Sequence, residues 1–164
     1  MLFRSFTRSL AKRLDGLSAV AVVEAEDGMP VLPGRVHLAP GGHHLTVRQE
    51  RGRAVLRLDD GPQVHSCRPA VDVLLRSAAE VWGGRTLTVV LTGMGHDGLA
   101  GAGALRDLGG QVIAQDEETS VVWGMPGAVT RAGVAGAVLP LGAIAAAVRS
   151  AVALAVGPAQ RKDQ

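Results

Sequence analysis

A glycine-rich turn carrying one carboxylate is the stretch of this sequence best suited to chemistry. It reads Leu-Thr-Gly-Met-Gly-His-Asp-Gly over residues 91–98, after an apolar run at 87–90 and before an Ala- and Gly-rich segment typical of a helix. Glycines leave the backbone free to turn tightly or to approach a ligand, and such turns often carry functional groups. Asp97 is therefore the first candidate for a functional side chain. The simpler interpretation is that Asp97 caps the helix that follows it, because Asp is a preferred N-cap residue.

The same turn also fits the G-x-G-x-x-G pattern of dinucleotide-binding proteins. Its three glycines have the required spacing, and the next strand ends at Asp116-Glu117, near where a ribose-binding acid is expected. In such sites the helix N-terminus binds the pyrophosphate. Asp97 would place a like charge beside that group, so a dinucleotide-binding protein is kept only as a minority alternative.

Four of the five histidines, His37, His43, His44 and His65, lie in the first half of the chain. A metal site needs several ligands that converge on one point. No cysteine or second carboxylate stands at ligand spacing from the adjacent pair at 43–44. We interpret these histidines as surface or turn residues, with a cleft-lining position as the alternative for His44, and we expect no metal site.

The composition favours a core of small aliphatic side chains. Apolar residues make up 47% of the 164 residues and aromatic residues only 2%, which suits buried parallel strands covered by helices.

The net charge is +2, and the arginines are scattered, so the clustered positive charge of a nucleic-acid-binding protein is absent. The single cysteine, Cys67, excludes an internal disulfide and fits a reducing compartment. The longest apolar run, 142–156, is broken by Arg149 and is too short to span a bilayer. We therefore expect a cytoplasmic protein without membrane insertion.

The periodicity of apolar residues predicts one domain over residues 1–156 and a disordered tail at 157–164. Strands are expected at 19–24, 36–39, 87–90, 111–115 and 134–139, and a hairpin at 45–58. Helices are expected at 6–17, 69–82, 99–108, 126–131 and 141–156, and a short strand or turn at 121–126. The strand-helix-strand unit at 87–115 should form a parallel pair with a right-handed crossover. The fold class is thus α/β, a mainly parallel, Rossmann-type sheet flanked by helices, with a small β-hairpin insertion around residues 36–58.

Five segments match one protein family in order and spacing. They are residues 6–15, residues 33–41 with His44, residues 68–74, residues 91–98, and residues 115–117 with Gly124-Met125-Pro126. Over about Phe6 to Val148 the chain resembles the catalytic domain of the bacterial chemotaxis protein-glutamate methylesterases, the CheB type. Its fold is a methylesterase-like α/β sheet flanked by helices.

This resemblance implies hydrolysis of glutamyl methyl esters on the cytoplasmic helices of methylated chemoreceptors, which releases methanol and restores glutamate. The family uses a Ser-His-Asp triad and no metal or organic cofactor. Its Asp corresponds to Asp97, which would orient the catalytic histidine and stabilise the imidazolium. The resemblance further places Gly93, Met94, Gly95, His44 and Met125 around the active-site pocket.

In the family the nucleophilic serine and the catalytic histidine precede the helix that corresponds to residues 6–15. We therefore expect this chain to lack the N-terminal strand-turn-helix of the domain, with Asp97 as its only triad member. The alternative to an active methylesterase is a non-catalytic remnant that docks on receptor helices.

Overall fold

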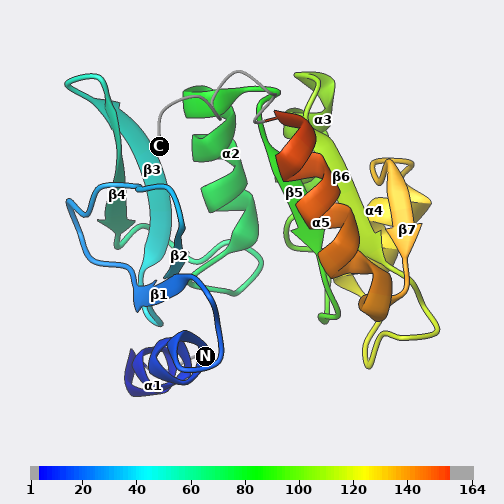
Figure 1. Ribbon diagram of the computed structural model, residues 1–164, viewed down its shortest axis with the longest axis horizontal. Coiled ribbons are helices and arrows are strands. Elements are labelled where there is room, and N and C mark those ends of the chain that lie inside the picture. Colours follow the sequence, from blue (N-terminus) through cyan, green and yellow to red (C-terminus); the bar gives the residue numbers. More distant parts are fainter. Residues whose placement is uncertain (1–3, 156–164) are drawn as a thin grey trace.

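The computed structural model describes residues 4–155 and shows an α/β fold (Figure 1). A β-hairpin lies on one side, α2 stands beside it, and a parallel sheet with α5 across it forms the other side (Figure 1). The helices are α1 (Arg4–Asp15), α2 (Val71–Trp82), α3 (Leu99–Asp107), α4 (Met125–Arg131) and α5 (Leu141–Ala155). The strands are β1 (Ala21–Glu24), β2 (Arg35–Leu38), β3 (His44–Glu50), β4 (Arg53–Asp59), β5 (Leu87–Val90), β6 (Gln111–Gln115) and β7 (Ala137–Leu139).

The described strands form three separate hydrogen-bonded sheets. β5, β6 and β7 make a parallel sheet in that order, β1 and β2 make a second parallel pair, and β3 and β4 form the antiparallel hairpin. The predicted parallel pairing across α3 is confirmed, as is the α/β fold class. The hairpin itself spans residues 44–59, because residues 35–38 pair with β1 instead of joining the insertion.

Two clusters of aliphatic side chains fill the interior. One packs β5 and β6 against α3 and α4, and it contains Val90, Ala102, Val112, Ala114, Val129 and Val134. The other packs the hairpin against α2, and it contains Ala25, Leu45, Val47, Leu56 and Ala78. Each fully buried Val or Leu contributes about 1.5–3 kcal/mol relative to an exposed one. The aromatic-poor core that the composition predicted is therefore what joins these elements.

Residues 121–124 form a turn, one of the two predicted alternatives, with one isolated bridge from Gly93 to Trp123. The Val122 N–H binds the Thr92 hydroxyl of the glycine turn. β7 is shorter than the predicted 134–139. The predicted tail at 157–164 lies outside the described residues. None of the helices between residues 4 and 155 combines the length and hydropathy that a bilayer crossing requires.

The first turns of α2 and α3 lie against each other. A Cβ atom added to Gly101 of α3 would lie only 2.5 Å from the Leu75 Cβ of α2. One added to Gly98 would lie 3.0 Å from Val71 Cγ1, and Gly98 has a φ of 90° that favours glycine. The two helix N-termini thus meet just beyond the carboxyl end of β5, where open α/β sheets bind their ligands.

Candidate functional site

Asp97 lies at this meeting point, buried, on the turn that connects β5 to α3. Its Oδ2 accepts the Val71 N–H at 2.7 Å, and its Oδ1 accepts the Asp72 N–H at 2.9 Å. Gly98, not Asp97, is the N-cap residue of α3. The interpretation that Asp97 caps the helix following it is therefore wrong: Asp97 caps α2, which begins 26 residues earlier.

A second carboxylate returns the contact in the opposite direction. Asp72, in the first turn of α2, accepts the Gly101 N–H of α3 on its Oδ1 at 2.8 Å. Neither helix receives a side-chain cap from its own N-cap residue, Ala70 or Gly98. The two acids therefore exchange caps, and each lies near the positive end of a helix dipole. Hydrogen bonds to charged groups contribute about 1.5–3 kcal/mol each, so the exchange holds the two helix starts together.

His44 satisfies a third backbone group at the start of α2. Its Nδ1 accepts the Ala70 N–H at 3.2 Å, and its Nε2 lies 3.0 Å from the Pro62 carbonyl oxygen. This pattern assigns the proton to Nε2, which donates to Pro62. His44 is buried, so the interpretation as a surface or turn histidine is wrong for it. His44 thus binds the backbone of Ala70, the residue directly before Val71, and the Val71 N–H in turn binds Asp97.

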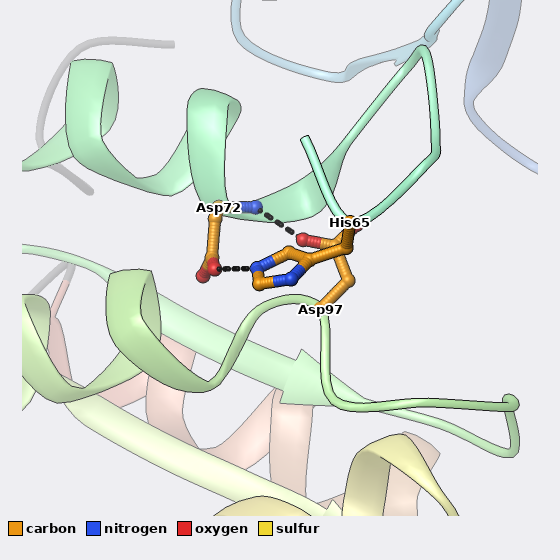
Figure 2. Close-up of side chains that lie close together, drawn as sticks. All are labelled: His65, Asp72 and Asp97. Atoms are coloured by element: carbon orange, nitrogen blue, oxygen red, sulfur yellow. Dashed lines mark hydrogen bonds and ion pairs between the residues drawn. The ribbon is translucent and has the colours of Figure 1, made fainter. Parts of the chain in front are cut away.

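His65 completes the cluster from the loop between β4 and α2 (Figure 2). Its Nε2–H donates to Asp72 Oδ2 at 2.9 Å, and its ring meets the His96 ring edge-on at a centroid distance of 4.6 Å. Figure 2 shows the imidazole beside both carboxylates, with the Asp72 backbone N–H directed at Asp97. His65 is exposed and lies in a turn, as expected, with 31% of its side chain accessible.

His65, Asp72 and Asp97 also have the convergence that a metal ion requires. One ligand atom from each lies within 4.8 Å of the others. The search around residues 43–44 considered spacing along the sequence, and it did not reveal this group because the fold joins it from three separate segments. The carboxylates already accept three backbone N–H groups, and a cation here would face the positive ends of two helices.

The predicted pocket residues on the glycine turn have different surroundings. A Cβ on Gly93 would lie 2.6 Å from the Met125 Sδ, so the Met125 side chain covers Gly93 and packs on the core. The Gly93 carbonyl accepts the N–H groups of Gly124 and Met125. Met94 is 86% exposed, and a Cβ on Gly95 would meet no atom within 4 Å. The backbone of the turn is thus anchored on one side and open on the other.

The acid at the end of β6 is already used locally. Asp116 Oδ1 accepts the Thr119 N–H at 3.0 Å and the Thr119 hydroxyl at 2.6 Å. The dinucleotide alternative needs a pyrophosphate at this helix start, but the two buried carboxylates Asp72 and Asp97 lie there, and their like charge disfavours it.

A cavity of about 530 Å³ lies along β6, β7 and α5, and its lining contains none of the predicted site residues.

The family model described as CheB methylesterase matches residues 2–148 of this chain. The chain belongs to the CheB methylesterase family. One relative is the protein-glutamate methylesterase/protein-glutamine glutaminase 2 of Caulobacter vibrioides, 56% identical over 137 residues, which are 83% of this chain and 40% of the relative. Another, the protein-glutamate methylesterase/protein-glutamine glutaminase of Symbiobacterium thermophilum, is 53% identical over 147 residues, or 90% of this chain and 40% of the relative.

A solved structure agrees with this family assignment. The crystal structure of the Thermotoga maritima CheB methylesterase catalytic domain superposes with a TM-score of 0.85 at 47% identity, covering 87% of this chain and 76% of that one. The chain spans about 40% of the length of the two CheB relatives named above. Membership of this family and the α/β fold are therefore established for the stretch that matches.

The sequence did not reveal two residues of the cluster around Asp97, namely Asp72 and His65. Asp72 gave one usable signal, since an acid in the first turn of a helix is favoured by the helix dipole. That signal predicts a stabilised helix start, but it does not identify the second helix whose N–H the carboxylate binds. His65 gave no signal, because its partner becomes a neighbour only when the loop before α2 folds back.

Proposed function

We propose that this chain forms part of a cytoplasmic protein-glutamate methylesterase in which Asp97 is the acid of the catalytic triad. The observation that carries the proposal is the buried Asp97 carboxylate, held by two backbone N–H groups at the carboxyl end of β5. A triad acid needs a fixed position and an oxygen free to accept an imidazole N–H. Two of about four acceptor positions on the carboxylate are used by α2, so acceptor capacity remains for the catalytic histidine.

The chemistry follows from the roles that the family resemblance implies. The serine hydroxyl oxygen attacks the ester carbonyl of a methylated glutamate side chain, and the histidine takes the hydroxyl proton. The histidine then returns that proton to the departing methoxy oxygen, so methanol leaves and an acyl-enzyme remains. Water, activated by the same histidine, hydrolyses the acyl-enzyme to serine and a glutamate carboxylate. Asp97 keeps the imidazole in the orientation and tautomer that both steps need.

The substrates we propose are methylated glutamates on the cytoplasmic helices of chemoreceptors. The names of the relatives support the glutamyl methyl ester, and they also include protein-glutamine glutaminase. The same attack on a glutamine side chain would release ammonia in place of methanol. The proposal for the cytoplasm is supported by the single cysteine, Cys67, which is exposed and unpaired, as suits a reducing compartment.

The glycine turn is proposed to line the pocket around the ester. Gly93 is fixed by its bonds to residues 124–125, whereas the space next to Gly95 is open and Met94 is exposed. A backbone without Cβ atoms lets an ester approach closely. His44 and Met125 would support this wall from behind, His44 through Ala70 and Met125 through Gly93.

The first experiment is to sequence the DNA upstream of the Met1 codon, in frame, for a glycine-rich strand-turn with serine and a following strand that ends in histidine. The protein encoded with that segment is then assayed for methanol release from a methylated receptor fragment. Asp97→Asn should lower kcat by about 10⁴, because the amide favours the wrong imidazole tautomer. A full rate in D97N, or no methanol release by an extended protein that carries both motifs, would overturn the proposal.

A further inference from the structure

The His65 imidazole joins the first turn of α2 to the segment that carries Asp97. On one side its Nε2–H donates to Asp72 Oδ2 at 2.9 Å. On the other side its ring packs edge-on against the ring of His96, the residue directly before Asp97. We propose that His65 is a positioning residue that fixes the Asp97 carboxylate in its working orientation.

The effect passes through Asp72. The Asp72 backbone N–H is one of the two donors to Asp97, and the Asp72 carboxylate is bound between His65 and Gly101. Asp72 is 1% exposed while His65 is in place, and the imidazole is the side-chain donor to its Oδ2, so removing the ring leaves that oxygen without its protein partner. A buried carboxylate oxygen left without its donor is unfavourable. The first turn of α2 then rearranges, and the two N–H groups that hold Asp97 move with it.

The backbone around His65 supports a fixed placement of this ring. His65 and Ser66 have φ values of 52° and 59°, a left-handed conformation that side chains other than glycine rarely adopt. Such strain persists only where the surroundings over-determine it, and it gathers at functional sites. The two carboxylates in front of the ring and the His96 ring beside it are those surroundings.

The left-handed backbone also provides a clean substitution. His65→Gly removes the imidazole and is compatible with a φ of 52°, so the variant should fold. His65→Gln keeps an N–H donor close to the place of Nε2 and serves as the conservative rescue. His43→Gly is the matched control, because His43 also pairs with an acid, Asp60, but the Asp60 side chain is 77% exposed.

Amide hydrogen exchange in the 164-residue protein reads the positioning directly. In H65G the Val71 and Asp72 amides should exchange at least tenfold faster than in the parent, and amides within α5 should keep their rates. H65Q should stay within threefold of the parent, and H43G should match it. The proposal is overturned if H65G leaves the Val71 and Asp72 amides protected, if H65Q exchanges as fast as H65G, or if all amides accelerate equally.

Activity provides the second readout, and it rests on the proposed methylesterase function. In the active enzyme H65G should lower kcat about tenfold with KM unchanged, and H65Q should recover most of that loss. A loss confined to KM, or an equal loss in both variants, contradicts positioning. If the parent enzyme releases no methanol, the methylesterase proposal fails, and the exchange rates of Val71 and Asp72 still decide the role of His65.

Discussion

The contact between α2 and α3 predicts that one substitution will have opposite effects at two glycines of the same helix. A Cβ on Gly101 would lie 2.5 Å from Leu75 Cβ and 3.3 Å from Asp72 Oδ1. The first distance is about 1 Å short of the 3.5–4.0 Å at which carbon atoms pack. A Cβ on Gly103, two residues on, would meet only Val134 Cγ2 at 3.9 Å, an ordinary contact.

The magnitudes follow from two general effects. Replacing glycine by alanine inside a helix stabilises by about 0.8–1 kcal/mol, and Gly103→Ala should show nearly all of this gain. Overpacking costs about 1–3 kcal/mol, because α2 and α3 must move apart to accept the new methyl group. Because the same gain applies at both positions, Gly101→Ala should destabilise by up to about 2 kcal/mol net. The two variants should differ by the overpacking cost, about 1–3 kcal/mol, or roughly 2–12 °C in Tm for a chain of this size.

Urea unfolding followed by far-UV circular dichroism measures both variants against the parent. G103A should raise the denaturation midpoint and G101A should lower it, with similar m values. Equal midpoints for G101A and G103A would refute the close approach of the two helices, and with it the exchange of caps that places Asp97. Because the Gly101 N–H binds Asp72, G101A should also speed exchange of the Val71 and Asp72 amides.

Two predictions concern the dependence of stability on pH. Leu58 N–H lowers the pKa of Asp27 and Arg57 lowers that of Glu50, so their stabilisation is present above the usual values of 3.8 and 4.5 and is lost as pH falls through the folded values. Glu50→Gln should therefore lose less stability than the parent in urea titrations between about pH 5 and pH 3, and an equal loss contradicts the assignment.

Burial lowers the pKa of His37 below its usual 6.5, and its Nε2 has no partner among the described residues. The free energy of unfolding should therefore decline as pH falls from 6.5 toward the pKa of the folded protein. Calorimetric melts of His37→Leu should show a smaller decline than the parent between about pH 7 and pH 5, and parallel curves would refute this cause.

The secondary structure could be predicted closely because its signals are local. Apolar patterns and turn residues placed the helices and strands, and the parallel β5–β6 pair followed from the strand-helix-strand order. Asp97 was identified for the same reason, since a strand, a glycine turn and one acid are consecutive in the sequence. The hairpin start was less certain, because nothing local distinguishes a strand that pairs with β1 from one that begins the hairpin.

The partners of Asp97 could not be predicted, because every one of them is distant in sequence. Val71 and Asp72 precede it by 26 and 25 residues, and they become neighbours only after β5 has placed α3 beside α2. The different surroundings of the adjacent residues His43 and His44 could not be predicted from the sequence either. One pairs with the exposed Asp60 and the other is buried under Ala70, a division set by which face of the hairpin α2 covers.

The cap exchange explains how one carboxylate can stabilise the fold and still serve the catalytic role proposed for it. Asp97 uses one acceptor position on each oxygen for α2, so a histidine N–H can still be accepted without releasing the helix. Aligned at the positive ends of α2 and α3, Asp72 and Asp97 can both remain buried although their charges are alike. We therefore expect Asp97 to stabilise the fold before any substrate is bound, so loss of this side chain should weaken the α2–α3 junction whether or not methanol release is assayed. An Asp97→Ala variant with the parent's urea midpoint would separate the two roles and leave Asp97 with catalysis alone.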